Sequence, residues 1–281
     1  MTARSAAAAR APFRDLRPAE SWARIAVRGD LFLGRFDDAA LRRELLEAGL
    51  LGGLAERGYP NVSIRMSALG DEHRLRLLAP GLVAPLVDLR LAEAAAFFKD
   101  PPRLRLGLEV FSFLSVRGLV LQDPRGTFPA DRPRLPGQDH PGLGLFSRLI
   151  GRLGQWAEDW GKDGLLAFPP HFHVAVMASR SLRFVSAARQ GRFEALRRDL
   201  ALHPLGDASR AVEAEGVVDQ AGTSIAWEPA EMVAALAHDL RDYLESEDYG
   251  KEMGAAREGA RYRFSPPHAS HGQSARRSRK L

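Results

Sequence analysis

The chain of 281 residues is 45% hydrophobic and 27% charged and contains no cysteine, a composition typical of a globular protein with one large or two small domains. The absence of cysteine excludes disulfide bonds, thiolate metal ligands and a cysteine nucleophile. Because no apolar run is long enough to span a membrane and the Ala6–Ala9 run is too short for a signal-peptide core, we expect a cytoplasmic protein.

The formal net charge of +5 comes mostly from the end of the chain, where residues 265–281 contain four basic residues and no acidic residue. These basic residues are Arg276, Arg277, Arg279 and Lys280. The segment is therefore predicted to be a disordered basic tail. Nucleic acid is not expected as a partner apart from non-specific contact with this tail.

The first predicted helix follows residues 1–36, which are rich in Ala, Arg and Pro and are expected to be mostly irregular. Asp37 and Asp38 mark its start, because aspartate side chains accept hydrogen bonds from the free N–H groups of a helix. Five leucines then follow at helical spacing, and Gly58 ends the helix. These leucines are Leu41, Leu45, Leu46, Leu50 and Leu54.

Residues 61–91 predict three short antiparallel strands, because apolar and polar residues alternate along them. The apolar face is formed by Val62, Ile64, Met66, Leu75, Leu77, Val87, Leu89 and Leu91. The polar face is formed by Arg65, Arg74, Arg76, Asp88 and Arg90. This arginine-rich row is either a basic binding surface or a solvated face with internal ion pairs.

The next stretch combines a short predicted helix with an ambiguous segment. Residues 92–100 predict a helix that Pro101 stops. Residues 104–121 are strongly apolar; their length favours a helix, whereas their aromatic and β-branched residues favour a strand. Glu109 lies in this segment, and its carboxylate would need a partner if it were buried.

The segment Leu135–Phe146 contains three glycines, two prolines and the pair Asp139-His140. Such a constrained turn usually positions backbone or side chains for a task. The elements predicted after it are a helix at 146–160, a strand at 165–168, a helix at 171–180, a strand at 182–185, a helix at 193–203, a hairpin at 210–227 and a helix from 228. Together they indicate a mixed α/β (α+β) core over residues 37–190, with a C-terminal extension over residues 191–264 that packs on the core.

Gly142 and Gly144 directly precede the helix predicted at 146–160. A glycine-rich turn at a helix N-terminus offers free N–H groups and the positive end of the helix dipole, which suits a pyrophosphate. Here the chain resembles the acetyl-CoA-dependent GNAT acyltransferases, whose phosphate loop reads Arg/Gln-x-x-Gly-x-Gly/Ala before a helix. The order of predicted elements over residues 40–190 is also similar to that of the family.

This resemblance implies a GNAT-like central mixed sheet flanked by helices, with a C-terminal helical extension. It also implies acetyl-CoA or another acyl-CoA as cofactor, and acyl transfer to a small-molecule or peptide amine. The cofactor-binding residues that it implies are Gly142, Leu143, Gly144 and Leu145. Two departures are present: Asp139 occupies the Arg/Gln position and would repel a phosphate, and Pro141 removes one N–H group. The run Leu135–Gly144 is also similar to one in an uncharacterised bacterial family, which implies no activity.

Acyl transfer of this kind requires a base, because the amine must lose a proton before it attacks the thioester. A Glu or His with a pKa near the working pH would serve. Glu109 is the first candidate for the catalytic base and His140 is the second. This reading requires the Gly142–Leu145 turn to open toward a gap between two parallel strands.

Two alternatives use the same region differently. One is a metal-dependent hydrolase, in which His140, His171 and His173 would converge with Asp139 or Asp123 on a metal. A metal is not favoured, because a helix is predicted at 171–180 and rings two residues apart on a helix point apart. The other is a non-catalytic binding protein in which Leu135–Phe146 is a recognition loop, with an exposed apolar or basic patch. The oligomeric state stays open.

Overall fold

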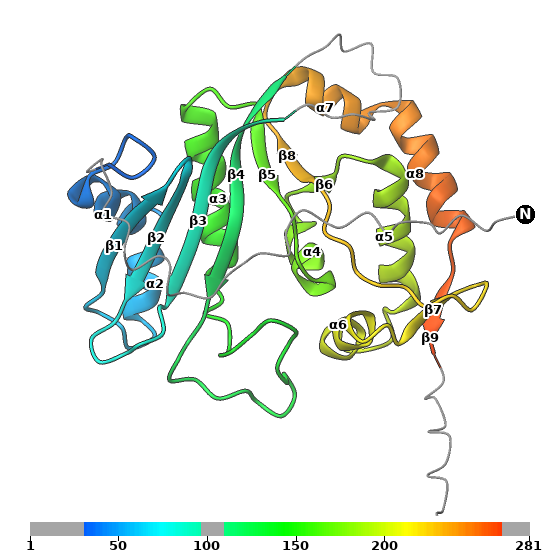
Figure 1. The fold of residues 1–281 in the computed structure, drawn as a ribbon, viewed down its shortest axis with the longest axis horizontal. Coiled ribbons are helices and arrows are strands. Elements are labelled where there is room, and N and C mark those ends of the chain that lie inside the picture. The colour runs from blue at the N-terminus through cyan, green and yellow to red at the C-terminus, as the bar shows by residue number, and fades with distance from the viewer. Residues whose placement is uncertain (1–30, 97–109, 266–281) are drawn as a thin grey trace, which may run out of the picture.

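The computed structural model describes residues 31–96 and 110–265, which form a seven-stranded mixed sheet, a separate two-stranded sheet and eight helices (Figure 1). The large sheet has the strand order β1-β2-β3-β4-β5-β8-β6. The prediction of a mixed α/β fold is thereby confirmed. The expectations for residues 1–30, for the basic tail beyond residue 265 and for Glu109 lie outside the described residues. No helix in the described ranges is long and apolar enough to cross a membrane.

The first four strands form an antiparallel meander, of which the sequence predicted three strands. They are β1 (Ser63–Leu69), β2 (Glu72–Leu78), β3 (Val87–Ala96) and β4 (Phe111–Leu121). The helix predicted at 92–100 is wrong for residues 92–96, which extend β3 because they pair with residues 111–115 of β4. The ambiguous apolar segment is a strand over Phe111–Leu121, which lies between β3 and β5 in the sheet.

The single helix predicted up to Gly58 is two helices, α1 (Asp38–Glu47) and α2 (Leu50–Ala55). Gly49, between them, adopts a φ of 68°, a left-handed conformation that ends a helix. The predicted cap is present: the Asp37 carboxylate accepts a hydrogen bond of 2.7 Å from the Ala40 N–H group.

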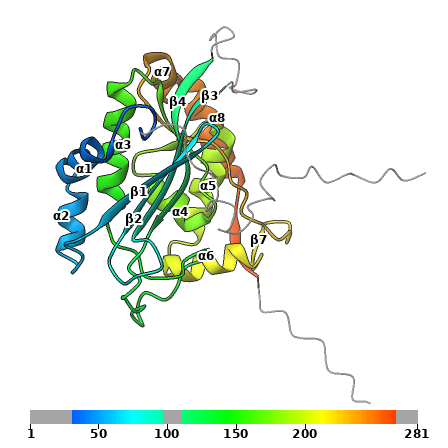
Figure 2. The same cartoon turned by 60° about the vertical axis from the view of Figure 1, so that its left-hand side comes forward.

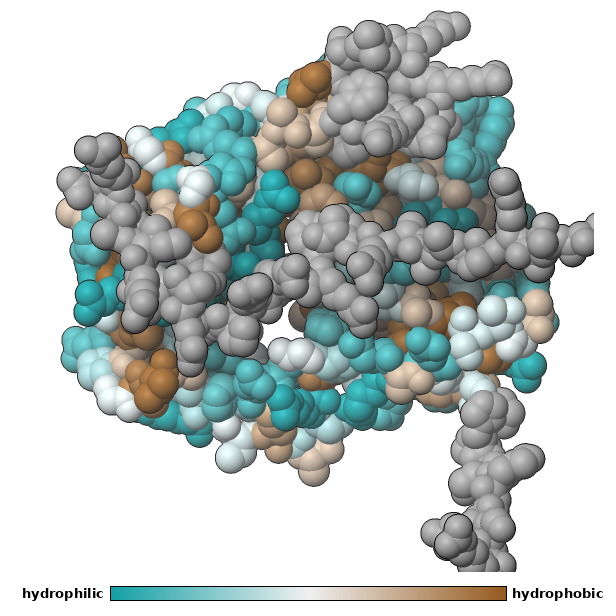
Figure 3. Space-filling view, viewed as in Figure 1, coloured by the Kyte–Doolittle hydropathy of each residue, from teal (hydrophilic) through white to brown (hydrophobic). Residues whose placement is uncertain are grey.

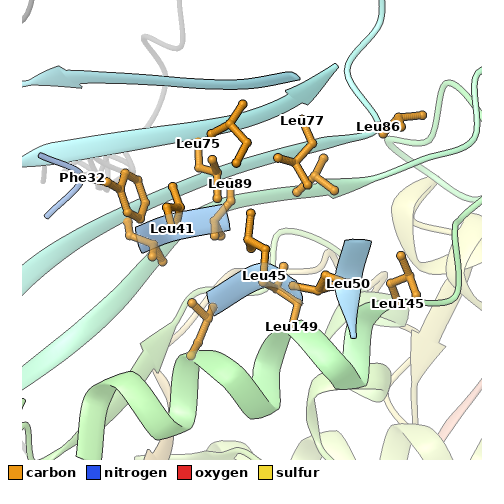
Figure 4. Close-up of a cluster of buried hydrophobic side chains, with 14 of the residues drawn as sticks. Phe32, Leu41, Leu45, Leu50, Leu75, Leu77, Leu86, Leu89, Leu145 and Leu149 are labelled. Atoms are coloured by element: carbon orange, nitrogen blue, oxygen red, sulfur yellow. The ribbon is translucent and has the colours of Figure 1, made fainter. Parts of the chain in front are cut away.

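The main hydrophobic core lies between the meander and three helices. Figure 2 shows α1, α2 and α3 (Phe146–Asp159) together against one face of the sheet. In the close-up of Figure 4, Leu41 and Leu45 of α1 lie in the middle of this core. Sheet residues such as Leu75 lie on one side of them, and Leu149 of α3 lies on the other side. This packing fixes the start of α3 relative to β4.

The second half of the sheet follows the predicted order at first. After α3 come β5 (Gly164–Ala167), α4 (Phe172–Ala178), β6 (Arg183–Phe184) and α5 (Ala187–Asp199). The helix predicted from residue 228 is wrong at Met232 and Val233, which belong to strand β8 (Met232–Ala235). This strand lies between β5 and β6 and is antiparallel to both, which leaves both residues no more than 1% exposed.

The C-terminal elements are α6 (Leu205–Glu213), β7 (Val217–Asp219), α7 (His238–Glu245), α8 (Glu247–Gly259) and β9 (Tyr262–Phe264). The hairpin predicted at 210–227 is wrong at its start, because residues 210–213 end α6, and β7 pairs with β9. Its turn is present, since Val218 still forms a bridge with Ser224. The tyrosine hydroxyl groups of α7 and α8 donate hydrogen bonds to Val185 O and Phe184 O, which ties these helices to β6.

Candidate functional site

Strands β4 and β5 are parallel neighbours that separate at their carboxyl ends. They pair only over Phe113–Val116 and Gly164–Ala167. Beyond this point β4 continues to Leu121, while β5 ends before Pro169 and Pro170. We call this divergence beyond Val116 and Ala167 the β4–β5 fork.

A β-bulge contributes to the fork. On β3, Arg90 pairs with Gly118 and Leu91 pairs with Val116, so Arg117 has no partner in the β3–β4 register. Such an extra residue bends its strand and increases the local twist. Figure 1 shows the ribbons of β4 and β5 diverging toward their carboxyl ends, and Figure 3 shows the surface in the same view. Ligands of open α/β sheets bind outside the carboxyl ends of parallel strands, which is where the β4–β5 fork lies.

The Gly142–Leu145 turn lies at the carboxyl end of β4. The Asp123 N–H group donates a hydrogen bond of 2.7 Å to Pro141 O, and Gln122 forms a bridge with Gly142. The Leu143 and Leu145 side chains are 2% and 1% exposed, whereas both glycines are exposed. The leucines therefore anchor the turn in the core, and the glycines present its backbone to solvent.

The N–H groups at the start of α3 are the feature of the turn that most favours the binding of an anion. No side chain in the described part of the chain caps this helix. The first N–H groups of a helix have no partner within it, so those at the start of α3 are available to an anion. Among the four residues that the resemblance implied, Leu143 donates its N–H group to Leu121 O at 3.4 Å. Leu145 is buried, so Gly144, which is exposed, is the better-placed donor.

Two arginines lie beside this turn. A Cβ at residue 144 would lie 3.5 Å from the Arg57 Nη2 atom. The Arg57 and Arg148 guanidinium groups donate to Gly53 O at 2.7 Å and to Gly49 O at 2.8 Å. Within the described ranges neither forms an ion pair with a carboxylate. The turn therefore has two guanidinium groups that no carboxylate of the described residues neutralises, and no pattern in the sequence predicted that Arg57 would be one of them.

The Asp139 carboxylate, which would repel a phosphate, forms an ion pair with Arg134. Its Oδ1 atom lies 2.7 Å from Arg134 Nη2, and its side chain is 79% exposed. The repulsion expected between Asp139 and a phosphate is reduced accordingly. His140, the second candidate base, is half-buried on the same loop.

His171 and His173 come together, but with partners from α6. Their rings are stacked, with centroids 5.5 Å apart and planes 10° apart. His171 Nδ1 lies 3.1 Å from Glu213 Oε2, and His173 Nδ1 lies 2.8 Å from Ser209 Oγ. Burial, with a smaller contribution from the neighbouring His171, lowers the pKa of His173 to about 4. His173 is therefore neutral at pH 7.

The described residues contain no group of three or more His, Asp or Glu side chains placed to hold a metal ion. The convergence of His140, His171 and His173 that a metal-dependent hydrolase requires is thus not found. The sequence could not point to Glu213 or Ser209, because they lie 42 and 36 residues from their histidine partners.

The arginine-rich face of the meander is partly explained by ion pairs. Arg74 binds both carboxylate oxygens of Asp88, and Arg90 lies 3.7 Å from Glu72. Both pairs link neighbouring strands, as expected for cross-strand partners. These contacts favour the solvated, ion-paired interpretation for half of the row.

The chain matches no protein-family model, and its comparison with curated proteins finds no similar sequence.

Proposed function

We propose that this protein is an acyl-CoA-dependent N-acyltransferase, which transfers an acetyl or another acyl group to an amine. The observation that carries the proposal is the β4–β5 fork with the uncapped start of α3 at its mouth. This is the arrangement that such an enzyme requires: a turn with free N–H groups beside a gap between two parallel strands. The resemblance of Gly142–Leu145 to the GNAT phosphate loop supports the same conclusion.

The charges at the turn fit the diphosphate of a CoA. The exposed N–H group of Gly144 would donate a hydrogen bond to it, and Arg57 and Arg148 would neutralise it. The bound cofactor would supply the acyl thioester. The extended arm of the bound cofactor, which carries the thioester, would lie in the fork between β4 and β5, away from water.

Acyl transfer would also need a side chain that takes the proton of the amine. Glu109 and His140 are the candidates from the sequence. The His171–Glu213 pair is a third, because the carboxylate holds Nδ1 and leaves Nε2 as the proton acceptor. All three are compatible with an amine acceptor, whose identity stays open.

A thermal-shift titration with acetyl-CoA tests the proposal. Acetyl-CoA at about 100 times its Kd should stabilise the protein by about 2.7 kcal/mol. Gly144→Glu, which places a carboxylate in the turn at a φ of 67°, should abolish this shift. Arg57→Glu should weaken it without backbone strain, because Arg57 is exposed and does not have a positive φ.

Gly151→Glu is the matched control, because Gly151 is exposed on the same helix and a Cβ there meets nothing within 4 Å. It should leave the shift unchanged. A wild-type protein that shows no shift with acetyl-CoA would contradict the proposal. In that case the non-catalytic binding hypothesis for Leu135–Phe146 would take its place.

A further inference from the structure

Ser115 is a buried hydroxyl group at the point where the β4–β5 fork begins. Its side chain is 0% exposed, and its Oγ atom has no hydrogen-bond partner in the described part of the chain. Buried polar groups are nearly always hydrogen-bonded, because leaving one unpaired costs free energy. An unpaired hydroxyl in a core strand therefore needs an explanation.

The position of Ser115 suggests one. It pairs with Leu166 on β5, one residue before the last β4–β5 pair, Val116 and Ala167. The β-bulge at Arg117 follows two residues later. Ser115 is thus at the apex of the fork, where the two strands cease to hydrogen-bond to each other.

The surroundings of the Ser115 hydroxyl are apolar. Alternation along β4 puts Ser115 on the same face as Phe111 and Phe113, and the pairing puts it beside Leu166. Its partner on β3 is Ala92, which is 1% exposed. Water is excluded at this point, so a hydrogen bond made by Ser115 would be strong and selective.

We propose that Ser115 is a positioning residue that donates a hydrogen bond from Oγ to the thioester carbonyl oxygen of an acyl-CoA bound in the β4–β5 fork. This inference rests on the proposed function. The bond would fix the acyl group at the apex, with the diphosphate at the Gly142–Leu145 turn. It would also favour acyl-CoA over free CoA, which has no carbonyl at that place.

The test compares the binding of acetyl-CoA and free CoA by wild-type protein and by Ser115→Ala. The variant should be as stable as the wild type or more stable, because it removes an unpaired polar group. It should bind acetyl-CoA roughly 5- to 10-fold more weakly and bind free CoA unchanged. Ser112→Ala is the control: it lies on the opposite face of β4, and its hydroxyl already bonds to Asp163 at 3.1 Å. Ser112→Ala should lose stability and keep the preference for acetyl-CoA.

Two outcomes would overturn the inference alone. One is an unchanged preference for acetyl-CoA in Ser115→Ala. The other is a loss of stability accompanied by an equal loss of affinity for both ligands, which would indicate a structural role. A wild-type protein that binds neither ligand would overturn the proposed function and the Ser115 inference together. This result is distinguishable from the two outcomes above, in which the wild-type protein still binds acetyl-CoA.

Discussion

Gly137 lies against the edge of the His171 ring, so that a Cβ at residue 137 would lie only 2.5 Å from the His171 Nε2 atom. Gly137 also has a φ of 72°, which disfavours any residue with a side chain. The same loop contacts α6, where Arg210 donates a hydrogen bond of 2.8 Å to Arg134 O. The loop that carries the candidate cofactor turn is therefore docked on α4 and α6.

Gly137→Ala is expected to disturb this docking. The unfavourable φ and the contact with His171 should together lower the free energy of unfolding by about 2 kcal/mol, measured by denaturant titration. Gly81→Ala is the matched control, because Gly81 has a φ of 76° and open space around it. Equal losses in the two variants would show that the contact with His171 contributes nothing.

The buried His173 should make stability depend on pH. Its pKa is about 4 in the folded protein and 6.5 in the unfolded chain, so the unfolded chain binds the proton first as pH falls. Stability should therefore decrease from about pH 6.5 to about pH 4, by about 3 kcal/mol at most, and level off below. His171, Glu213 and Ser209 are the polar groups that face it.

Thermal unfolding of His173→Gln between pH 4 and pH 7 checks this expectation. The variant should lose most of the dependence attributed to His173. His238→Gln serves as the control, because His238 is exposed beside Asp242 on α7. A His173→Gln profile that parallels the wild-type profile would remove His173 as the cause.

Tyr59 is hydrogen-bonded to the start of the loop that connects β4 and α3. Its side chain is 2% exposed, and its hydroxyl donates a hydrogen bond to Asp123, whose Oδ1 atom also accepts from the Arg125 and Gly126 N–H groups. Tyr59→Phe leaves Asp123 with one bond fewer and should cost about 1–2 kcal/mol of stability. Acetyl-CoA affinity should fall as well, because Asp123 pairs with Pro141 beside the turn. Asp131→Asn, at an exposed position of the same loop, should change neither quantity.

Substitution of the candidate bases separates catalysis from binding. If Glu109 takes the proton, Glu109→Gln should lower kcat about 100-fold or more while the thermal shift with acetyl-CoA stays unchanged. His140→Gln should then have a small effect. The reverse result would assign the role to His140, and unchanged kcat in both variants would leave His171, tested by His171→Gln, as the base.

The sequence by itself determined the elements whose burial follows a local period. Alternation placed Leu75, Leu77 and Leu89 on the buried face of the meander, and helical spacing placed α3. The glycines before α3 also located the exposed turn, because their conformational freedom is a local property.

The tertiary structure decided what depends on distant partners. Met232 and Val233 form a strand because β5 and β6 flank them, and residues 92–96 extend β3 because β4 pairs with them. Likewise, packing of α2 against α3 brings Arg57 to the turn, and α6 supplies the partners of His171 and His173. The physical reason is that periodicity reports which side of a segment is buried, whereas the burying partner is set only when the whole chain packs.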